Sequence, residues 1–160
     1  MSPIHRVAAR VLPISPAGEV LLLQGQDPAA PGVLHWVSIG GAVDPGETLA
    51  AAALRELAEE TGIAARETDL LGPVARATHP FSWDGRSYVS DNHFFAMRLD
   101  PATDVHFRGL EAAEVGNILQ AAWWTPAALS DDGTAASRDL PEIMEAAIAA
   151  AIAPAGGDPL

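Results

Sequence analysis

Three glutamates stand close together near the middle of the chain, at Glu56, Glu59 and Glu60. At about 100° per residue, a helix would place Glu59 and Glu60 within roughly 60° on either side of Glu56, so that one face carries all three carboxylates. Side chains three or four residues apart on a helix lie roughly 5–6 Å apart at their Cβ atoms. At an effective dielectric constant near 20, each such pair of like charges would cost roughly 3 kcal/mol before screening.

Such repulsion can be relieved in three ways. The side chains can spread into water, a carboxyl pKa can rise, or the face can bind a divalent cation. Hard oxygen ligands of this kind suit Mg²⁺ or Mn²⁺. A solvated acidic face is the plainer interpretation of a glutamate-rich helix taken alone, and the segment before the helix favours the metal site instead.

The segment from Leu49 to Thr61 is predicted to be this helix. Thr48 precedes it and can accept a hydrogen bond from an N–H of the first turn. Gly62 follows it and can take the left-handed conformation that ends many helices. A separate face carries apolar residues that we expect to form the core side, namely Ala50, Ala53, Leu54 and Leu57.

A glycine- and proline-rich loop leads into the helix, and loop and helix together follow a defined pattern. The pattern occupies nine positions, at Gly41, Glu47, Arg55, Glu56, Leu57, Glu59, Glu60, Gly62 and Ile63. It resembles the Nudix box at every specified position. A match that spans a loop and a helix is far more specific than a lone glycine motif. The chain is therefore identified as resembling the Nudix family.

This resemblance implies the ligands of the metal site. Glu56, Glu59 and Glu60 correspond to the metal-binding carboxylates, with Glu59 and Glu60 as the central pair. The backbone carbonyl of Gly40 is similar to a further ligand in the family. The implied cofactor is Mg²⁺, or Mn²⁺ in its place.

The resemblance also implies roles for two residues that support the site. Glu47 resembles a loop carboxylate that steadies it, either through the water shell of the metals or by pairing with Arg55. Arg55 resembles a structural residue that holds the loop to the helix. The alternative for Arg55 is a surface pair with Glu59, which would contribute only a few tenths of a kcal/mol.

A late acidic residue serves several family members as a general base or as an extra metal ligand. Glu111 and Glu114 are the candidates here, in the irregular segment that begins at Asp100 and precedes a short strand. Their positions do not choose between them. For each one alone, an ordinary surface glutamate remains the alternative.

Several further residues are candidates to bind substrate. His35 could line a pocket or be a structural histidine. The segment around Asp84 and Gly85 is predicted to be a hairpin. Its aromatic residues are candidates to stack on a base, with core or interface packing as the alternative: Phe81, Trp83 and Tyr88.

The second predicted strand lacks a residue that the family often has. Many members end this strand in an arginine that reaches a substrate phosphate. The nearby positions in this chain are Gln24 and Gln26. This particular phosphate contact is therefore not transferred to the chain.

The elements that must position these residues alternate between strands and helices. Strands are expected over Val7–Ile14, Val20–Leu23, Leu34–Ile39, Leu70–Thr78, His93–Leu99 and Ala121–Trp124. Helices are expected over Leu49–Thr61, Pro126–Leu129 and Leu140–Ile152. This order predicts an α/β fold with a mixed sheet, and the resemblance implies the Nudix α/β/α sandwich. We expect a single domain over residues 1–153 and a disordered tail over 154–160.

Composition excludes several classes of protein. The net charge is −12, and all nine basic residues are arginines, so the chain lacks the basic footprint of a protein that binds nucleic-acid polymers. A small phosphorylated nucleotide remains a suitable partner if divalent metal neutralises it locally. The absence of cysteine excludes a disulfide scaffold and a thiolate metal site. No targeting or membrane-spanning segment is predicted, so we expect a cytoplasmic protein without a membrane partner; a homodimer stays open.

The resemblance implies Mg²⁺-dependent hydrolysis of a diphosphate bond. The substrate would be a nucleoside diphosphate linked to another group, such as a nucleoside triphosphate, a nucleotide sugar, ADP-ribose or an oxidised nucleotide. One alternative is a non-hydrolysing Nudix domain that senses a nucleotide, against which the intact set of ligands argues. A second alternative is an isoprenoid diphosphate isomerase, which the absence of cysteine disfavours.

Overall fold

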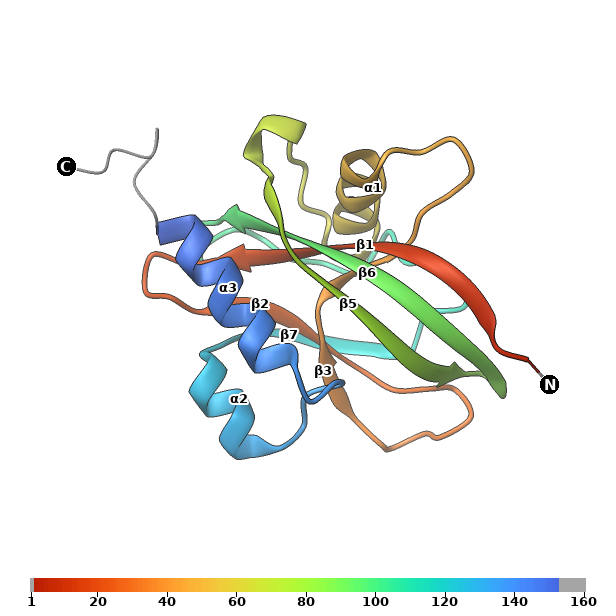
Figure 1. Cartoon of the computed structure of the whole chain (residues 1–160). Helices are drawn as coiled ribbons and strands as arrows, with labels where there is room; N and C mark the ends of the chain where they lie inside the picture. Colours follow the sequence, from red (N-terminus) through yellow and green to blue (C-terminus); the bar gives the residue numbers. More distant parts are fainter. Residues whose placement is uncertain (1, 153–160) are drawn as a thin grey trace.

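The computed structural model describes residues 2–152 of the chain, and Figure 1 shows how its elements are arranged. Within these residues one seven-stranded sheet is formed by β1 (Ile4–Ile14), β2 (Val20–Gly25), β3 (His35–Val37), β4 (Ile39–Ala42), β5 (Leu71–Trp83), β6 (Arg86–Arg98) and β7 (Ile118–Trp124). The helices are α1 (Leu49–Thr61), α2 (Pro126–Asp132) and α3 (Leu140–Ile152), with a short 3₁₀ turn at Glu67–Asp69. The predicted tail at 154–160 lies outside the described residues.

The sheet is mixed, and strand β1 is its branch point. The main path runs β3-β2-β1-β6-β5, while β4 pairs with β1 and β7 pairs with β2. β1 is parallel to β6 and antiparallel to both β2 and β4. Along one edge, β1 pairs with β4 at Ala8 to Val11 and with β2 only at Ile14, opposite Val20. The sheet therefore divides beside β1, and this division leaves room for a cleft.

Helices cover both faces of the sheet, because side chains alternate between the faces along each strand. On β1, Ala9 and Val11 belong to the apolar cluster on the α1 side, whereas Leu12 and Ile14 belong to the cluster on the α2 and α3 side. In Figure 1, α1 lies on one side of the sheet and α2 and α3 lie on the other. The predicted α/β class, the mixed sheet and the α/β/α sandwich are confirmed.

Strands β1, β5 and β6 are longer than their sequence patterns predict. β1 begins at Ile4 rather than Val7, because its pairing with β6 continues out to Tyr88. The predicted turn at Asp84 and Gly85 is present with φ angles of 50° and 77°, as a tight hairpin requires. That turn joins β5 and β6 into one long hairpin, where the sequence pattern predicts a short hairpin followed by a separate strand.

The predicted strand Leu34–Ile39 is divided into β3 and β4 at Ser38. β3 pairs with β2, whereas β4 pairs with β1, so the chain changes partner at this point. Gly40 follows at φ 145°, a conformation that favours glycine, and a Cβ there would collide with the backbone oxygen of Ala9. The division brings the turn at Gly40 and Gly41, here called the glycine turn, close to β1.

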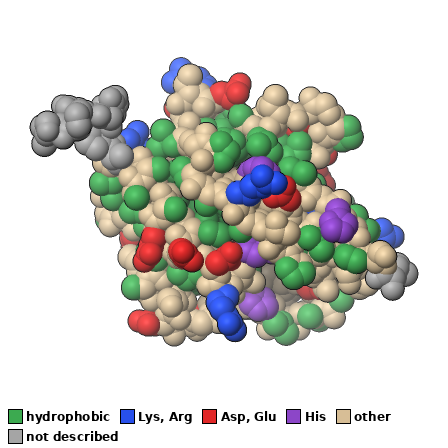
Figure 2. Space-filling view, viewed as in Figure 1, with side chains coloured by type: hydrophobic (Ala, Val, Ile, Leu, Met, Phe, Trp, Pro, Cys, Tyr) green, Lys and Arg blue, Asp and Glu red, His purple; other side chains and the backbone are tan. Residues whose placement is uncertain are grey.

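On the face seen in Figure 2, the blue basic side chains stand apart from one another rather than forming one patch. The net charge of the chain is −12. None of the helices between residues 2 and 152 is long and apolar enough to cross a membrane.

Candidate active site

Helix α1 has the ends that local chemistry predicts. The Thr48 hydroxyl accepts a hydrogen bond from the Ala51 N–H at 3.0 Å, which satisfies one orphan donor of the first turn. Gly62 is left-handed, with φ 77°, and donates its N–H to the Ala58 carbonyl at 2.9 Å. The predicted bounds, Leu49 and Thr61, are therefore confirmed.

The buried face of α1 includes two of the three glutamates, which corrects the predicted core side. Its buried residues are Ala52, Ala53, Glu56, Leu57, Glu60 and Thr61. Ala50 and Leu54, predicted to be core, are only half-buried. Glu56 is 8% exposed and Glu60 is 4% exposed, so these two carboxylates do not form a solvated acidic face. The helix is rotated further toward its acidic side than the apolar pattern alone predicts.

Arg55 joins the loop before α1 to the helix itself. Its Nε and Nη2 donate to the two carboxylate oxygens of Glu47 at 2.7 and 2.9 Å, and Nη2 also donates to the Ala42 carbonyl. Its Nη1 donates to Glu56 at 3.0 Å and to Glu59 at 3.3 Å. Of the two ways in which Glu47 could steady the site, the structure shows the pairing with Arg55. The contact with Glu59 is one part of this network rather than an isolated surface pair.

The glycine turn packs directly against the buried carboxylates. The Gly40 N–H donates to Glu60 Oε1 at 2.7 Å. A Cβ on Gly41 would lie 2.6 Å from Glu56 Oε1, so only glycine allows the backbone to approach this carboxylate so closely. The two consecutive glycines thus form one wall against which Glu56 and Glu60 are held.

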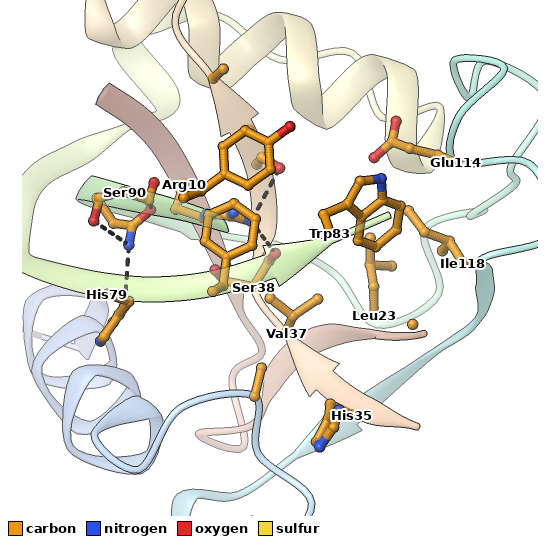
Figure 3. A pocket seen from close by; sticks show the side chains of 18 of the residues that line it. Arg10, Leu23, His35, Val37, Ser38, His79, Trp83, Ser90, Glu114 and Ile118 are labelled. Carbon is orange, nitrogen blue, oxygen red and sulfur yellow. Dashed lines mark hydrogen bonds between the residues drawn. The ribbon is translucent and has the colours of Figure 1, made fainter. Parts of the chain in front are cut away.

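Arg10 of β1 occupies the other side of the same turn. Its Nη1 donates to the Ser38 carbonyl at 3.0 Å and to the Gly40 carbonyl at 3.1 Å, as the dashed lines in Figure 3 show. The carbonyl that the family resemblance assigns to the metal therefore already accepts a hydrogen bond. A carbonyl oxygen has two lone pairs, so this bond does not exhaust its capacity as a ligand.

Burial and like charge both work against ionisation of the α1 carboxylates. Burial raises the pKa of Glu60 well above its usual range, and a hydrogen-bonding contact with Glu114 raises it further. Burial also raises the pKa of Glu56, although Arg55 opposes the shift. Glu114 acts on both groups from the irregular segment between β6 and β7, here called the late loop. A cation at this point would relieve the repulsion.

A cleft of about 880 Å³ opens beside these carboxylates. Most of the predicted site residues line it: Gly40, Arg55, Glu56, Glu60, His35, Phe81, Trp83, Tyr88, Glu111 and Glu114. Glu47 and Glu59 are not among the lining residues. Figure 3 shows His79 and Ser90 on one side of the cleft and Trp83 and Glu114 on the other, with Arg10 between them.

The cleft also contains residues that the sequence patterns do not single out: Arg6, Arg10, His79, Ser90 and Asn92. A signal for the two arginines exists. They are in phase with Leu12 and Ile14 along β1, so charged groups continue a face that is otherwise apolar. No comparable sequence signal marks the other three residues. His79 lies on β5, and Ser90 and Asn92 lie on β6.

His79 fixes the start of α3 against the hairpin. The Asn92 Nδ2 lies 3.1 Å from His79 Nδ1, and His79 Nε2 lies 2.8 Å from both carboxylate oxygens of Asp139. Because an amide nitrogen can only donate, the ring proton belongs on Nε2, directed at Asp139. The Ser90 hydroxyl donates to Asn92 Oδ1 at 2.9 Å and completes the network. This network holds one wall of the cleft.

The donors near the glycine turn fit a hard divalent cation in their chemistry. Glu56, Glu60 and Glu114 supply carboxylate oxygens in a partly buried position, and Gly40 supplies a carbonyl. In this structure Arg55 and Gly40 engage the oxygens of Glu56 and Glu60. No three acidic or histidine side chains within residues 2–152 are gathered as a ready-made ligand cluster. The donor atoms present thus fit the metal that the resemblance implies. In this structure, Arg55 and the Gly40 N–H hold the carboxylates of Glu56 and Glu60 in place.

The model of the NUDIX domain matches residues 4–144. The chain belongs to the Nudix family. The sequence-based prediction of the family is confirmed.

Curated relatives match part of this Nudix chain. It is 37% identical over 99 residues to an uncharacterized Nudix hydrolase, orf19, from Rhodococcus erythropolis, a match covering 59% of this chain and 48% of that protein. It is 37% identical over 75 residues to the RNA pyrophosphohydrolase of Erythrobacter litoralis, covering 40% of this chain and 44% of that protein. The matches thus span somewhat less than half the length of these curated relatives.

Solved structures share the fold at lower identity. A C. elegans Ap4A hydrolase in a binary complex superposes with a TM-score of 0.61 at 23% identity, covering 88% of this chain and 93% of that chain. At this identity, the likeness concerns the fold alone. It agrees with the α/β/α sandwich described above.

Proposed function

We propose that this Nudix chain is a hydrolase that cleaves a diphosphate bond in a nucleoside diphosphate linked to another group, with Mg²⁺ or Mn²⁺ as cofactor. One observation carries the proposal. Glu56 and Glu60 are buried against Gly40 and Gly41 beside Glu114, at the wall of a cleft large enough for a nucleotide. Buried carboxylates that repel one another are costly unless a cation or proton joins them, and such groups mark functional sites.

Three glutamates of α1 have the proposed role of metal ligands. Glu56 and Glu60 lie at the cleft, and Glu59 adjoins them through Arg55. A bound metal would neutralise phosphate charge and acidify a water molecule. Gly40 would add its carbonyl to the ligand set.

Glu114 is the proposed late-loop base or additional ligand. It contacts Glu60, which is held by the Gly40 N–H, whereas Glu111 is an exposed residue that lines the cleft. A general base must lie within hydrogen-bonding reach of the attacking water, directly or through one water. Glu114 is the better placed of the two because it adjoins the proposed metal ligands.

The proposed substrate class is a small nucleotide. Relatives of this chain are named as an RNA pyrophosphohydrolase and as an asymmetrical bis(5′-nucleosyl)-tetraphosphatase, and both names describe cleavage within a phosphate chain. Aromatic side chains line the cleft near the proposed metal site, among them Phe81, Trp83 and Tyr88. Such side chains suit a nucleobase.

The test is a panel assay for released phosphate or nucleotide across nucleoside triphosphates, nucleotide sugars and dinucleoside polyphosphates. We expect hydrolysis of at least one class in Mg²⁺, its loss in excess chelator, and its return with Mg²⁺ or Mn²⁺. Glu59→Gln and Glu60→Gln should each nearly abolish hydrolysis of the best substrate. Full activity after verified removal of metal would contradict the proposal, as would wild-type turnover in both variants.

A further inference from the structure

Arg6 lines the cleft in a position that is fixed from two sides. Its Nε donates to the Ser90 hydroxyl at 3.3 Å. Its Cζ lies 4.7 Å from the centroid of the Phe81 ring and 6.0 Å from that of Tyr88. The two rings stack on each other with centroids 5.0 Å apart and an angle of 11° between planes. An aromatic platform thus holds the guanidinium group in place.

No carboxylate of the described chain pairs with Arg6. The ion pairs among residues 2–152 include neither Arg6 nor Arg10. The only hydrogen bond that Arg6 donates there comes from Nε, so its two terminal nitrogens have no acceptor in this part of the chain. Arg10 donates only to the carbonyls of Ser38 and Gly40. Two cations therefore line a cleft without a bonded anion among residues 2–152, although unpaired charge in a sheltered site is unfavourable.

Arg6 remains charged and lies within electrostatic range of the proposed metal site. Burial and the neighbouring charge of Arg10 lower the pKa of Arg6 to about 10, while Glu56 and Glu60 act in the opposite direction. Arg6 is therefore a cation at neutral pH. The guanidinium of an arginine has the fork geometry that matches two oxygens of a phosphoryl group.

The side-chain oxygens of the two glutamines near the end of β2 already accept hydrogen bonds from other groups of the chain. Gln24 accepts a hydrogen bond from Gln120 at 2.7 Å, and it is not among the residues that line the cleft. Gln26 lines the cleft, and its side-chain oxygen accepts a hydrogen bond from the Gly32 N–H at 2.9 Å. The arginines that line the cleft are Arg6 and Arg10 of β1 and Arg55 of α1.

We propose that Arg6 binds a phosphoryl group of the substrate that lies beyond the diphosphate held at the α1 carboxylates. This inference rests on the proposed function and deepens it, because it makes the substrate a nucleotide whose phosphate chain has at least three phosphoryl groups. Arg10, between Arg6 and the glycine turn, lies along the path of that chain. Phe81 and Tyr88 then serve Arg6 as a platform, and Trp83 is left as the aromatic side chain for a base.

The test measures binding of two probes that resist hydrolysis, in the presence of Mg²⁺. Methylenediphosphonate carries two phosphoryl groups, and its bis-methylene triphosphonate homologue carries three. Calorimetry on wild type, Arg6→Gln and Arg6→Lys gives the gain in affinity that the third group provides. Arg86→Gln is the matched control, because Arg86 is an exposed arginine of the β5–β6 hairpin and its loss changes the net charge equally.

In wild type and Arg86→Gln, the third phosphoryl group should tighten binding about tenfold or more. Arg6→Gln should lose this gain and keep its affinity for the two-group probe, and Arg6→Lys should keep only part of it. Phe81→Leu, which removes the platform without removing the cation, should also reduce the gain. Thermal melting confirms that each variant is folded.

Two results would overturn the inference: no gain from the third group in wild type, or an equal gain in wild type and Arg6→Gln. Failure of the proposed function has a different signature. In that case, binding of the two-group probe would not depend on Mg²⁺ and would survive Glu59→Gln. On the panel substrates, Arg6→Gln should raise KM for triphosphates more than for nucleotide sugars, whereas loss of a base-stacking role would raise both alike.

Discussion

Arg55 is the residue on which the loop and helix of the site depend most directly. Its guanidinium contacts Glu47, Glu56 and Glu59, and it also donates to the Ala42 carbonyl. Bidentate pairing with Glu47 requires the planar fork of arginine, which lysine cannot reproduce. Sequence alone leaves two roles open for Glu47, because a motif gives the spacing of residues and not the direction of their side chains.

Glu47 should contribute to stability in a pH-dependent way. The hydrogen bonds from Arg55 and from the Asp44 N–H lower its pKa from the usual 4.5 to about 2. Its stabilising effect is therefore present above pH 4.5 and lost as the pH falls toward 2. We expect wild type to melt at a higher temperature than Glu47→Gln at pH 6, with a difference that shrinks toward pH 2. Glu145→Gln, at an exposed position on α3, is the control; an identical pH profile in all three proteins would contradict the expectation.

The two late-loop glutamates should differ in their effect on catalysis. Glu114 contacts Glu60, whereas Glu111 only lines the cleft. If Glu114 is the base or a ligand, Glu114→Gln should lower kcat by about 10²–10⁴-fold. Glu111→Gln is the matched control and should stay within a few-fold of wild type. The reverse order of rates would assign the role to Glu111, and wild-type rates in both variants and in the double variant would exclude the late loop.

At the scale of elements, prediction succeeds where local chemistry sets the ends of an element. Helix α1 matches its predicted bounds because Thr48 and Gly62 cap it. The predicted bounds of α3, Leu140 and Ile152, are also correct. Prediction fails for β1 and β6, whose lengths follow from pairing with each other over residues such as Ser90 that are polar. Such pairing is a long-range property that no local pattern contains.

Gly62 should be required for more than its left-handed backbone. A Cβ there would collide with the His106 ring, whereas a Cβ on Gly85, also at φ 77°, would meet nothing within 4 Å. Gly85→Ala should therefore lower the free energy of unfolding by about 1 kcal/mol, the cost of a left-handed backbone at a residue with a Cβ. Gly62→Ala should lose that amount plus the cost of displacing His106. Urea unfolding of both variants gives the difference, and adding His106→Ala to Gly62→Ala should recover part of it. Equal losses would show that His106 moves aside without cost.

At the scale of the whole molecule, the cleft draws on segments that are distant in the sequence. Arg6 and Arg10 come from β1, Glu56 and Glu60 from α1, and Glu114 from the loop before β7. The carboxylates on α1 are predictable because a motif spans them. The arginines carry only the weaker signal of their phase with Leu12 and Ile14, because they reach the cleft through the parallel pairing of β1 with β6 and the division of the sheet beside β1. In a chain with a net charge of −12, Arg6 and Arg10 place positive charge beside the carboxylates of the site.

Stability of the whole molecule should depend on metal through α1. Burial, followed by the contact with Glu114, raises the pKa of Glu60. Because the folded-state pKa of Glu60 is raised, the stability that this group contributes is fully present below its usual pKa of 4.5. That contribution is lost as the pH rises through the folded-state pKa. Metal-free Glu60→Gln keeps an oxygen for the Gly40 N–H and loses one repelling charge.

Metal-free Glu60→Gln should therefore be more stable than wild type at pH 8, by up to about 1 kcal/mol, and the difference should shrink toward pH 4. Added Mg²⁺ should raise the melting temperature of wild type and raise that of Glu60→Gln and Glu59→Gln much less, because ligand stabilisation follows affinity for the native state. The measurement is thermal melting of the three proteins at both pH values, with chelator and with Mg²⁺. A wild-type response to Mg²⁺ in both variants would mean that α1 does not hold the metal. A metal-free Glu60→Gln that is less stable than wild type at pH 8 would mean that the Glu60 charge stabilises the fold through Gly40 and Arg10 more than Glu56 and Glu114 oppose it.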